Sequence, residues 1–205
     1  MMLHIIFNKR FSWMQKYYTA DSANGLFESG VSEFCIVGLG DYTPKQPEQA
    51  DFLNQMYPEG LSKHGYNYLY NPNIMMGNLT HASKALMIGL VFELVRRSHF
   101  PEKPSRYQSL FACQQVSEAK QFRELLADEK ENDQIRKASI YEVITQRTVH
   151  RGDMELVKSD CPVLDLYRRA HLYWSGETVP YKDGGEPFCE ILIPLPVLIG
   201  QRVPE

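Results

Sequence analysis

Residues 187–194 read Pro-Phe-Cys-Glu-Ile-Leu-Ile-Pro, an apolar run that places one carboxylate, that of Glu190, inside a predicted buried strand. An ionised carboxylate taken out of water is costly unless it has a partner or a shifted pKa. Such a group is therefore a candidate functional residue. The same run also fits an edge strand whose first, solvent-facing residue is Glu190, and periodicity alone does not separate the two interpretations.

Composition limits the number of domains and the kinds of partner. The chain of 205 residues has 43% hydrophobic and 23% charged residues, as ordinary globular proteins do, and fits a single domain over residues 1–205. Its formal net charge of -3 gives no overall attraction to nucleic acid. The four cysteines and six histidines show none of the close spacings that metal sites use, so no metal is expected.

The sequence also indicates where the protein works. Residues 1–4, Met-Met-Leu-His, lack the basic and apolar regions of a secretory signal. The longest apolar run, from Leu86 to Val95, contains Glu93 and is about half as long as a bilayer-spanning helix. We therefore expect a cytoplasmic protein that makes no contact with a membrane.

The pattern along the chain predicts a mixed α+β domain. Strands are expected at 3–7, 105–113, 139–148 and 187–194, and helices at about 46–56, 78–100 and 117–131. A last helix is expected to start at Asp160 and Pro162 and to end at Gly176, with irregular structure between 148 and Asp160. Residues 12–72 are rich in Gly, Pro, Asn and Tyr and are expected to form an irregular insertion apart from the short helix.

Apolar spacing predicts the buried faces of two helices. In the helix at 78–100, Glu93 and Arg97 are expected to pair on the side opposite the apolar stripe. That stripe consists of Leu79, Ala82, Leu86, Leu90, Val91 and Leu94. In the last helix, one face carries Leu164, Tyr167, His171 and Trp174.

Three further segments could form a binding site with Glu190. Ser105, Arg106 and Tyr107 bring a hydroxyl, a guanidinium and a phenol to the start of a strand, where they could hold a phosphate or a ribose. Tyr173 and Trp174 could stack on a flat ring at the end of the last helix. His4 lies in the first predicted strand. The same residue types also occur in hydrophobic cores and at surface turns, so a purely structural role is the alternative interpretation of these segments.

The order of these segments carries a resemblance. The matching blocks are Leu3-His4, Val95-Arg96 to Phe100-Pro101, Pro104-Ser105-Arg106, Ala170 to Tyr173-Trp174-Ser175-Gly176, and Glu190-Ile191-Leu192-Ile193. Together they resemble a little-characterised bacterial family, DUF2441, which is in turn similar to ADP-ribosyltransferases. The closing Cys189 to Ile193, followed by Pro196-Val197, is also similar to the catalytic-glutamate strand of the DNA-modifying toxin DarT.

The resemblance implies an ADP-ribosyltransferase-like fold of split, bent β-sheets with flanking helices, which binds NAD between the sheets. It implies that Glu190 is catalytic and that His4, Ser105 and Arg106 contact NAD. Tyr107, Tyr173 and Trp174 complete the expected cofactor-binding set. Two features depart from the family pattern. Ile5-Ile6 stands where His4 would be followed by Gly-Thr, and Pro187-Phe188 replaces the acidic or Gln partner of arginine-modifying enzymes.

The resemblance further implies a bacterial toxin or phage-defence effector that transfers ADP-ribose to RNA or DNA, controlled by an antitoxin or a chaperone. Basic pairs that could steer a nucleic acid are Arg96-Arg97, Lys103-Arg106, Arg147-Arg151 and Arg168-Arg169. Alternatives are a protein acceptor, an NAD glycohydrolase that passes the sugar to water, and a non-catalytic nucleotide-binding module in which Glu190 is an edge residue.

Overall fold

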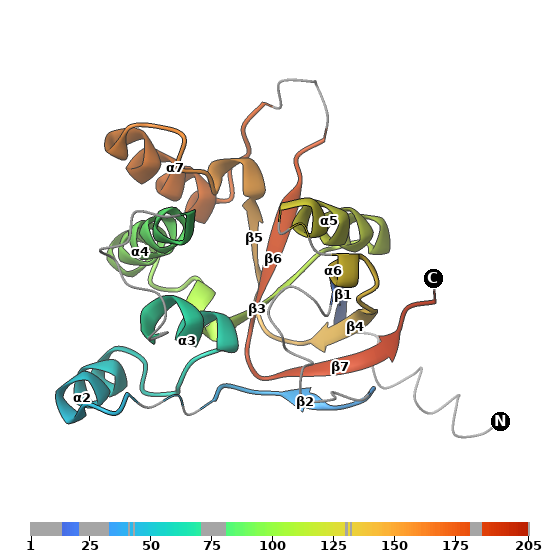
Figure 1. Ribbon diagram of the computed structural model, residues 1–205, viewed down its shortest axis with the longest axis horizontal. Helices are drawn as coiled ribbons and strands as arrows, with labels where there is room; N and C mark the ends of the chain where they lie inside the picture. The colour runs from blue at the N-terminus through green and yellow to red at the C-terminus, as the bar shows by residue number, and fades with distance from the viewer. Residues whose placement is uncertain are drawn as a thin grey trace.

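The computed structural model describes residues 14–20, 33–40, 42, 44–70, 81–129, 131, 133–180 and 186–204. Within these residues, two antiparallel sheets lie against a group of helices (Figure 1). The expectation of a mixed α+β fold is therefore confirmed at the level of its class. The strand predicted at 3–7, with His4, lies outside the described residues.

The four-stranded sheet has the strand order β1-β4-β7-β2, from β1 (Gln15–Ala20), β4 (Ile140–Thr145), β7 (Val197–Arg202) and β2 (Ile36–Val37). The three-stranded sheet has the order β3-β6-β5, from β3 (Ser109–Ala112), β6 (Cys189–Pro194) and β5 (His150–Asp153). Tyr18 of β1 and Cys113 form an isolated bridge where the two sheets approach each other. The chain passes from β6 in one sheet directly to β7 in the other.

The helices complete the domain. They are α2 (Pro47–Met56), α3 (Lys63–Tyr70), α4 (His81–His99), α5 (Val116–Glu129), α6 (Asp133–Arg136) and α7 (Val163–Ser175), with short 3-10 helices at η2 (Arg106–Gln108) and η3 (Met154–Leu156). None of the helices in the described part of the chain is long and apolar enough to cross a membrane.

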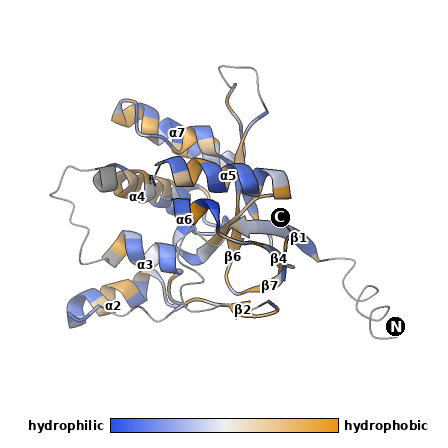
Figure 2. Cartoon of the chain, turned by 45° about the vertical axis from the view of Figure 1, so that its right-hand side comes forward, coloured by the Kyte–Doolittle hydropathy of each residue, from blue (hydrophilic) through white to orange (hydrophobic). Residues whose placement is uncertain are grey.

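The three-stranded sheet lies between two hydrophobic layers. Ile191 and Ile193 of β6 face the four-stranded sheet, where they pack with Val143 and Ile199. Leu192, on the opposite face of the same strand, packs with Phe92 of α4 and with residues of α7. Hydrophobic colour accordingly prevails on β6 and β7, whereas α5 shows mostly hydrophilic colour (Figure 2). Both faces of β6 are therefore covered, which explains its nearly unbroken apolar sequence.

Helix α4 confirms the predicted element and part of its predicted buried face. Of the expected stripe, Leu86 is buried and Val91 packs against the core, whereas Leu90 and Leu94 are 43% and 53% exposed and Leu79 lies outside the described residues. Glu93, expected on the opposite side, is 3% exposed. The predicted pairing of Glu93 with Arg97 is confirmed at 3.1 Å, and Arg96 binds the same carboxylate at 2.8 Å. The two guanidinium partners compensate for the loss of hydration when the carboxylate is buried. The helix can therefore turn this charged side toward the protein interior.

Helix α7 also differs from its predicted orientation. Leu164 is 80% exposed and Tyr167 44%, while the buried residues are Leu166, Ala170, Tyr173 and Trp174. The helix begins after Pro162 without a side-chain cap, and Asp160 binds Arg169 instead. Gly176 ends the helix at a positive φ of 83°, a conformation that glycine adopts easily.

Three local predictions were wrong. The segment at 12–72, expected to be irregular apart from one short helix, also contains β1, β2 and α3, and its two strands belong to the four-stranded sheet, whereas the expected helix is confirmed as α2. The strand expected from residue 105 begins at Ser109, because Ser105 caps a 3-10 turn. The stretch before Asp160 contains β5, whose His-Arg-Gly-Asp sequence has low strand propensity and becomes a strand by pairing with β6.

Candidate functional site

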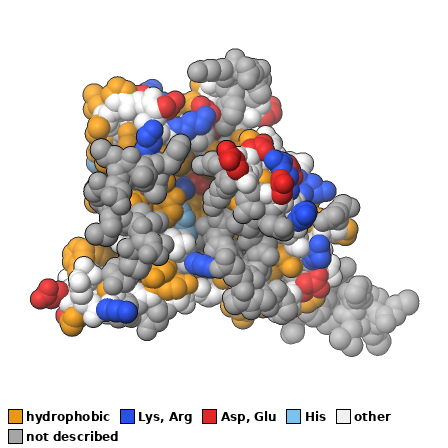
Figure 3. All heavy atoms as spheres, in the orientation of Figure 1, with side chains coloured by type: hydrophobic (Ala, Val, Ile, Leu, Met, Phe, Trp, Pro, Cys, Tyr) orange, Lys and Arg blue, Asp and Glu red, His pale blue; other side chains and the backbone are white. Residues whose placement is uncertain are grey.

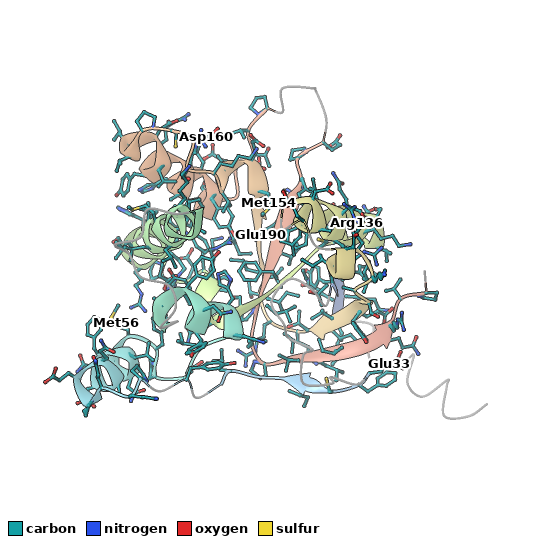
Figure 4. All side chains as sticks on the ribbon, in the orientation of Figure 1. Glu33, Met56, Arg136, Met154, Asp160 and Glu190 are labelled. Atoms are coloured by element: carbon teal, nitrogen blue, oxygen red, sulfur yellow. The ribbon has the colours of Figure 1, made fainter. Side chains whose placement is uncertain are left out.

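Glu190 is the second residue of β6, and β6 is the central strand of its sheet. Its backbone lies opposite Gly152 of β5, and its exposed fraction is 7%. The interpretation of Glu190 as a solvent-facing edge residue is therefore wrong. Figure 4 shows Glu190 near the middle of the molecule, between α7 and α5. The space-filling view shows a hollow in this region, with acidic, basic and histidine side chains at its floor (Figure 3).

Two side chains from distant segments bind one oxygen of Glu190. The Tyr173 hydroxyl, from α7, donates to Oε1 at 2.6 Å. Arg106 Nη1, from η2, donates to the same Oε1 and to the Tyr173 hydroxyl at 2.9 Å. Glu190 and Arg106 also form an ion pair whose two side chains are about nine-tenths buried. These three residues form a closed triangle, which we call the Glu190 triad.

Several polar atoms of the Glu190 triad have no hydrogen-bond partner among the described residues. Among the described residues, no group donates to Oε2 of Glu190. Arg106 Nε and Nη2 likewise make no hydrogen bond within the described part of the chain. These two nitrogens form the planar edge of a guanidinium that binds a phosphate or carboxylate through two parallel hydrogen bonds. The triad can therefore offer an anion-binding edge beside a carboxylate oxygen.

The surroundings of the triad keep its neighbours neutral. Burial raises the pKa of Tyr173 to about 12, so its phenol remains a hydrogen-bond donor. Burial, with the charge of Arg106, lowers the pKa of His64 to about 3. Burial, with the charge of Lys103, lowers the pKa of His150 to about 4. Neither histidine adds a positive charge near Arg106 at neutral pH, and Arg106 remains the cation of the triad.

Glu190 also lines a groove between β1, β3 and α5. The groove is shallow and open to solvent. Its apolar wall includes Tyr18, Phe111, Phe122 and Phe188, and the last two rings stack with their centroids 6.3 Å apart. Burial raises the pKa of the Cys113 thiol to about 12 and also raises that of Cys189, so both thiols of the groove stay protonated. The groove therefore presents a mostly apolar lining beside Glu190.

Other residues of the predicted set have different surroundings. The Ser105 hydroxyl donates to Glu93 and accepts from the Tyr107 backbone amide. Tyr107 is 2% exposed and packs against Tyr57 and Leu61. Trp174 is 0% exposed, and its indole donates to the Phe92 carbonyl at 2.8 Å. The expected stacking of Trp174 on a ligand is therefore not supported, because no face of its ring is exposed. His4 lies outside the described residues.

Sequence reasoning missed several residues around the triad. His150 of β5 lies under Tyr173 and Trp174, with ring centroids 5.0 Å and 4.8 Å away. A Cβ atom on Gly152 would overlap the Tyr173 ring. Neither residue belongs to a recognisable sequence motif. Gly152 carries the only local signal of the two, because an isolated glycine in a strand often marks a close approach of another group to the backbone.

The structure reduces the basic surface that the sequence predicted. Arg96 and Arg97 bind Glu93, and Arg106 binds Glu190. Arg168 and Arg169 bind Asp165 and Asp160, at 3.7 Å and 2.8 Å. Arg147 and Arg151 are exposed and form no ion pair with any described residue. The pair beside β5 is thus the remaining candidate from that set for contact with a polyanion.

Comparisons with known proteins bear on the family. A search of the curated proteins finds no match. The family model described as "Protein of unknown function (DUF2441)" matches residues 4–203. Because this match spans almost the whole chain, the protein belongs to the DUF2441 family.

Proposed function

We propose that the protein is an NAD-dependent ADP-ribosyltransferase and that Glu190 is its catalytic residue. The observation that supports the proposal best is the buried carboxylate of Glu190 on the central strand, which binds Arg106 and Tyr173 and lines an open groove. The resemblance of the sequence to ADP-ribosyltransferases led to the same residue. A cytoplasmic location is part of the proposal.

The chemistry requires a carboxylate at this position. When the bond between nicotinamide and ribose breaks, nicotinamide leaves with the electron pair and positive charge develops on the ribose. A carboxylate beside that ring interacts more strongly with the charged transition state than with bound NAD, and this difference accelerates the reaction. The acceptor then forms a bond to the ribose C1 and gives up its proton, for which Oε2 of Glu190 is the nearest base of the triad.

Arg106 and Tyr173 support this role in different ways. Both donate to Oε1 and hold the carboxylate in one orientation. The second edge of Arg106 is available for the diphosphate of NAD. When NAD occupies the groove, its apolar lining would limit the access of water to the reacting ribose, which strengthens the electrostatic interaction and limits hydrolysis.

For the acceptor, we propose a nucleic acid. Arg151 lies on β5 opposite Ile191, the residue after Glu190, and is exposed. Because side chains alternate along a strand, Arg151 leaves the sheet on the face opposite Glu190, where it acts on Cys189 of the groove, and with Arg147 it could bind phosphates of an acceptor on that side. A role as a toxin or phage-defence effector, controlled by an antitoxin or a chaperone, follows from the sequence resemblance alone and stays a prediction.

The test uses NAD radiolabelled in its adenylate portion, incubated with the protein and a cell lysate. Label should enter a macromolecular fraction, and nuclease but not protease should release it. Glu190→Gln should lower transfer on the order of 100-fold or more, as removal of a single electrostatic group does elsewhere. Glu142→Gln, on β4 of the other sheet, is the matched control and should keep full activity.

The other results are also informative. Protease-sensitive label would replace the nucleic acid with a protein acceptor. Free ADP-ribose without labelled macromolecules would indicate a glycohydrolase. If NAD released no nicotinamide, or if folded Glu190→Gln transferred label as well as the parent protein, the proposed function would be wrong.

A further inference from the structure

We propose that Glu93 is a positioning residue that acts through Ser105 and holds Arg106 against Glu190. The inference rests on the proposed function for its effect on catalysis, but the positioning itself is a structural claim. The position of Glu93 in the structure connects α4 with the turn that carries Arg106.

Glu93 occupies a saturated buried site on α4. Its Oε1 accepts from Arg96 Nη2 at 2.8 Å, from Arg97 Nε at 3.1 Å and from the Tyr57 hydroxyl at 3.2 Å. Its Oε2 accepts from Arg96 Nε at 3.0 Å. Two guanidinium groups already balance its charge. The additional hydrogen bond from Ser105 to Oε2, at 3.0 Å, is therefore not needed for neutralisation.

That additional hydrogen bond fixes the turn before β3. The Ser105 hydroxyl donates to Glu93 and, through its own oxygen, accepts from the Tyr107 amide at 3.1 Å, which caps the 3-10 helix η2. The Ser105 carbonyl accepts from the Ser109 hydroxyl at 2.7 Å. Arg106 is the residue between these anchored neighbours. Its backbone direction is thereby set from the α4 side.

The turn is also anchored from the α3 side. The Tyr107 carbonyl accepts from the Ser62 amide at 2.9 Å and from the Ser62 hydroxyl at 3.0 Å. The Arg106 guanidinium then lies over the Phe111 ring, with Cζ 4.8 Å from the centroid. A free arginine side chain loses considerable rotamer entropy when it is held in one place. Because the turn already fixes the backbone of Arg106, formation of the triad orders only its side chain.

The decisive experiment is a double-mutant cycle between Ser105→Ala and Arg106→Met, measured as kcat/KM for NAD. If Ser105 acts through Arg106, Ser105→Ala should lower kcat/KM on the order of 10-fold in the parent protein, in line with the cost of small misplacements. In the Arg106→Met background it should cause almost no further loss. Ser105→Thr keeps the hydroxyl and should restore activity. A general loss of packing would lower kcat/KM equally in both backgrounds, and that result would overturn the inference.

Ser98→Ala is the matched control. Ser98 is an exposed residue of α4 whose hydroxyl donates to the Leu94 carbonyl at 2.9 Å, away from the triad. This variant should keep the kcat/KM of the parent protein.

A second measurement does not depend on enzymatic activity. The coupling between Arg106→Met and Glu190→Gln, measured by urea unfolding, should be clear in the parent protein and largely lost when Ser105→Ala is added. Unchanged coupling would refute the positioning role. If the parent protein had no NAD-dependent activity, the proposed function would fail, and this unfolding cycle would still decide the inference.

Discussion

The Tyr173 hydroxyl and Glu190 Oε1 are 2.6 Å apart, and the phenol that makes this contact is completely buried. A tyrosine that donates to a buried carboxylate holds one oxygen in place and leaves the other for a ligand. Tyr173→Phe keeps the ring but removes the donor. It should lower the free energy of unfolding by about 1.5–3 kcal/mol, the usual value of a hydrogen bond to a charged group. Urea unfolding measures the loss, and an unchanged midpoint would contradict the contact.

Arg106→Met should be more damaging than Tyr173→Phe. Removing one partner of a buried ion pair leaves an uncompensated charge, which costs about 3 kcal/mol or more. Adding Glu190→Gln to Arg106→Met should recover part of that loss, because the remaining side chain is then uncharged. Equilibrium unfolding of the two single variants and the double variant tests this. A double variant less stable than either single variant would rule out the pairing.

Gly152→Ala tests the close packing beneath the triad. Its Cβ would overlap the Tyr173 ring, whereas a Cβ on Gly38 would meet nothing within 4 Å. Overpacking of this kind costs about 1–3 kcal/mol. Gly152→Ala should therefore lower the unfolding midpoint and impair transfer, and Gly38→Ala should do neither. Equal behaviour of the two glycine variants would show that Tyr173 moves aside freely.

The stability of the protein should fall with acidification in a specific pH window. In the folded state, burial lowers the pKa of His150 to about 4, whereas an ordinary histidine has a pKa of 6.5. Between pH 6.5 and about 4 the unfolded chain therefore takes up a proton at position 150 that the folded protein does not. Each such proton costs about 1.4 kcal/mol per pH unit, so stability decreases as the pH falls through this window.

The variant His150→Phe isolates this contribution. It should reduce the pH dependence of the unfolding midpoint between pH 6.5 and 4 without abolishing it, because His64, with a pKa of about 3, contributes in the same direction. It should also lose little stability at pH 7, because His150 Nε2 is buried without a hydrogen-bond partner among the described residues. His99→Gln, at an exposed residue of α4, serves as the control. An identical slope in His150→Phe and the parent protein would contradict the assignment.

The sequence predicted the elements with strong local signals. The apolar run at β6 and the long helix α4 both appear close to their predicted limits. Strand β5 could not be predicted, because its residues become a strand only through pairing with β6. The prediction of the buried face of α4 was partly wrong for a related reason. Apolar spacing assumes that charges face water, and Glu93 with Arg96 reverses that assumption by pairing inside.

Sequence reasoning selected Glu190, Arg106 and Tyr173, but not their relationship. Residues at the ends of three separate elements converge on one oxygen only after the sheet and α7 have packed together. Tyr173 and Trp174 have the composition of a ring-stacking site, yet both are buried in the core. A sequence does not distinguish an aromatic ring that covers a ligand from one that fills a hydrophobic layer. Their burial decides this, and burial is a property of the folded chain.

The central position of β6 constrains the length of this segment as well as its residues. β3 and β5 fix the register of β6 from both sides through Ala112, opposite Ile191, and Gly152, opposite Glu190. Because side chains alternate along a strand, inserting or deleting one residue between 189 and 194 would transfer the carboxylate to the opposite face. There it would meet the aliphatic layer against the four-stranded sheet, on the side away from Arg106. Evolution can therefore exchange residues along β6 more readily than it can alter their number.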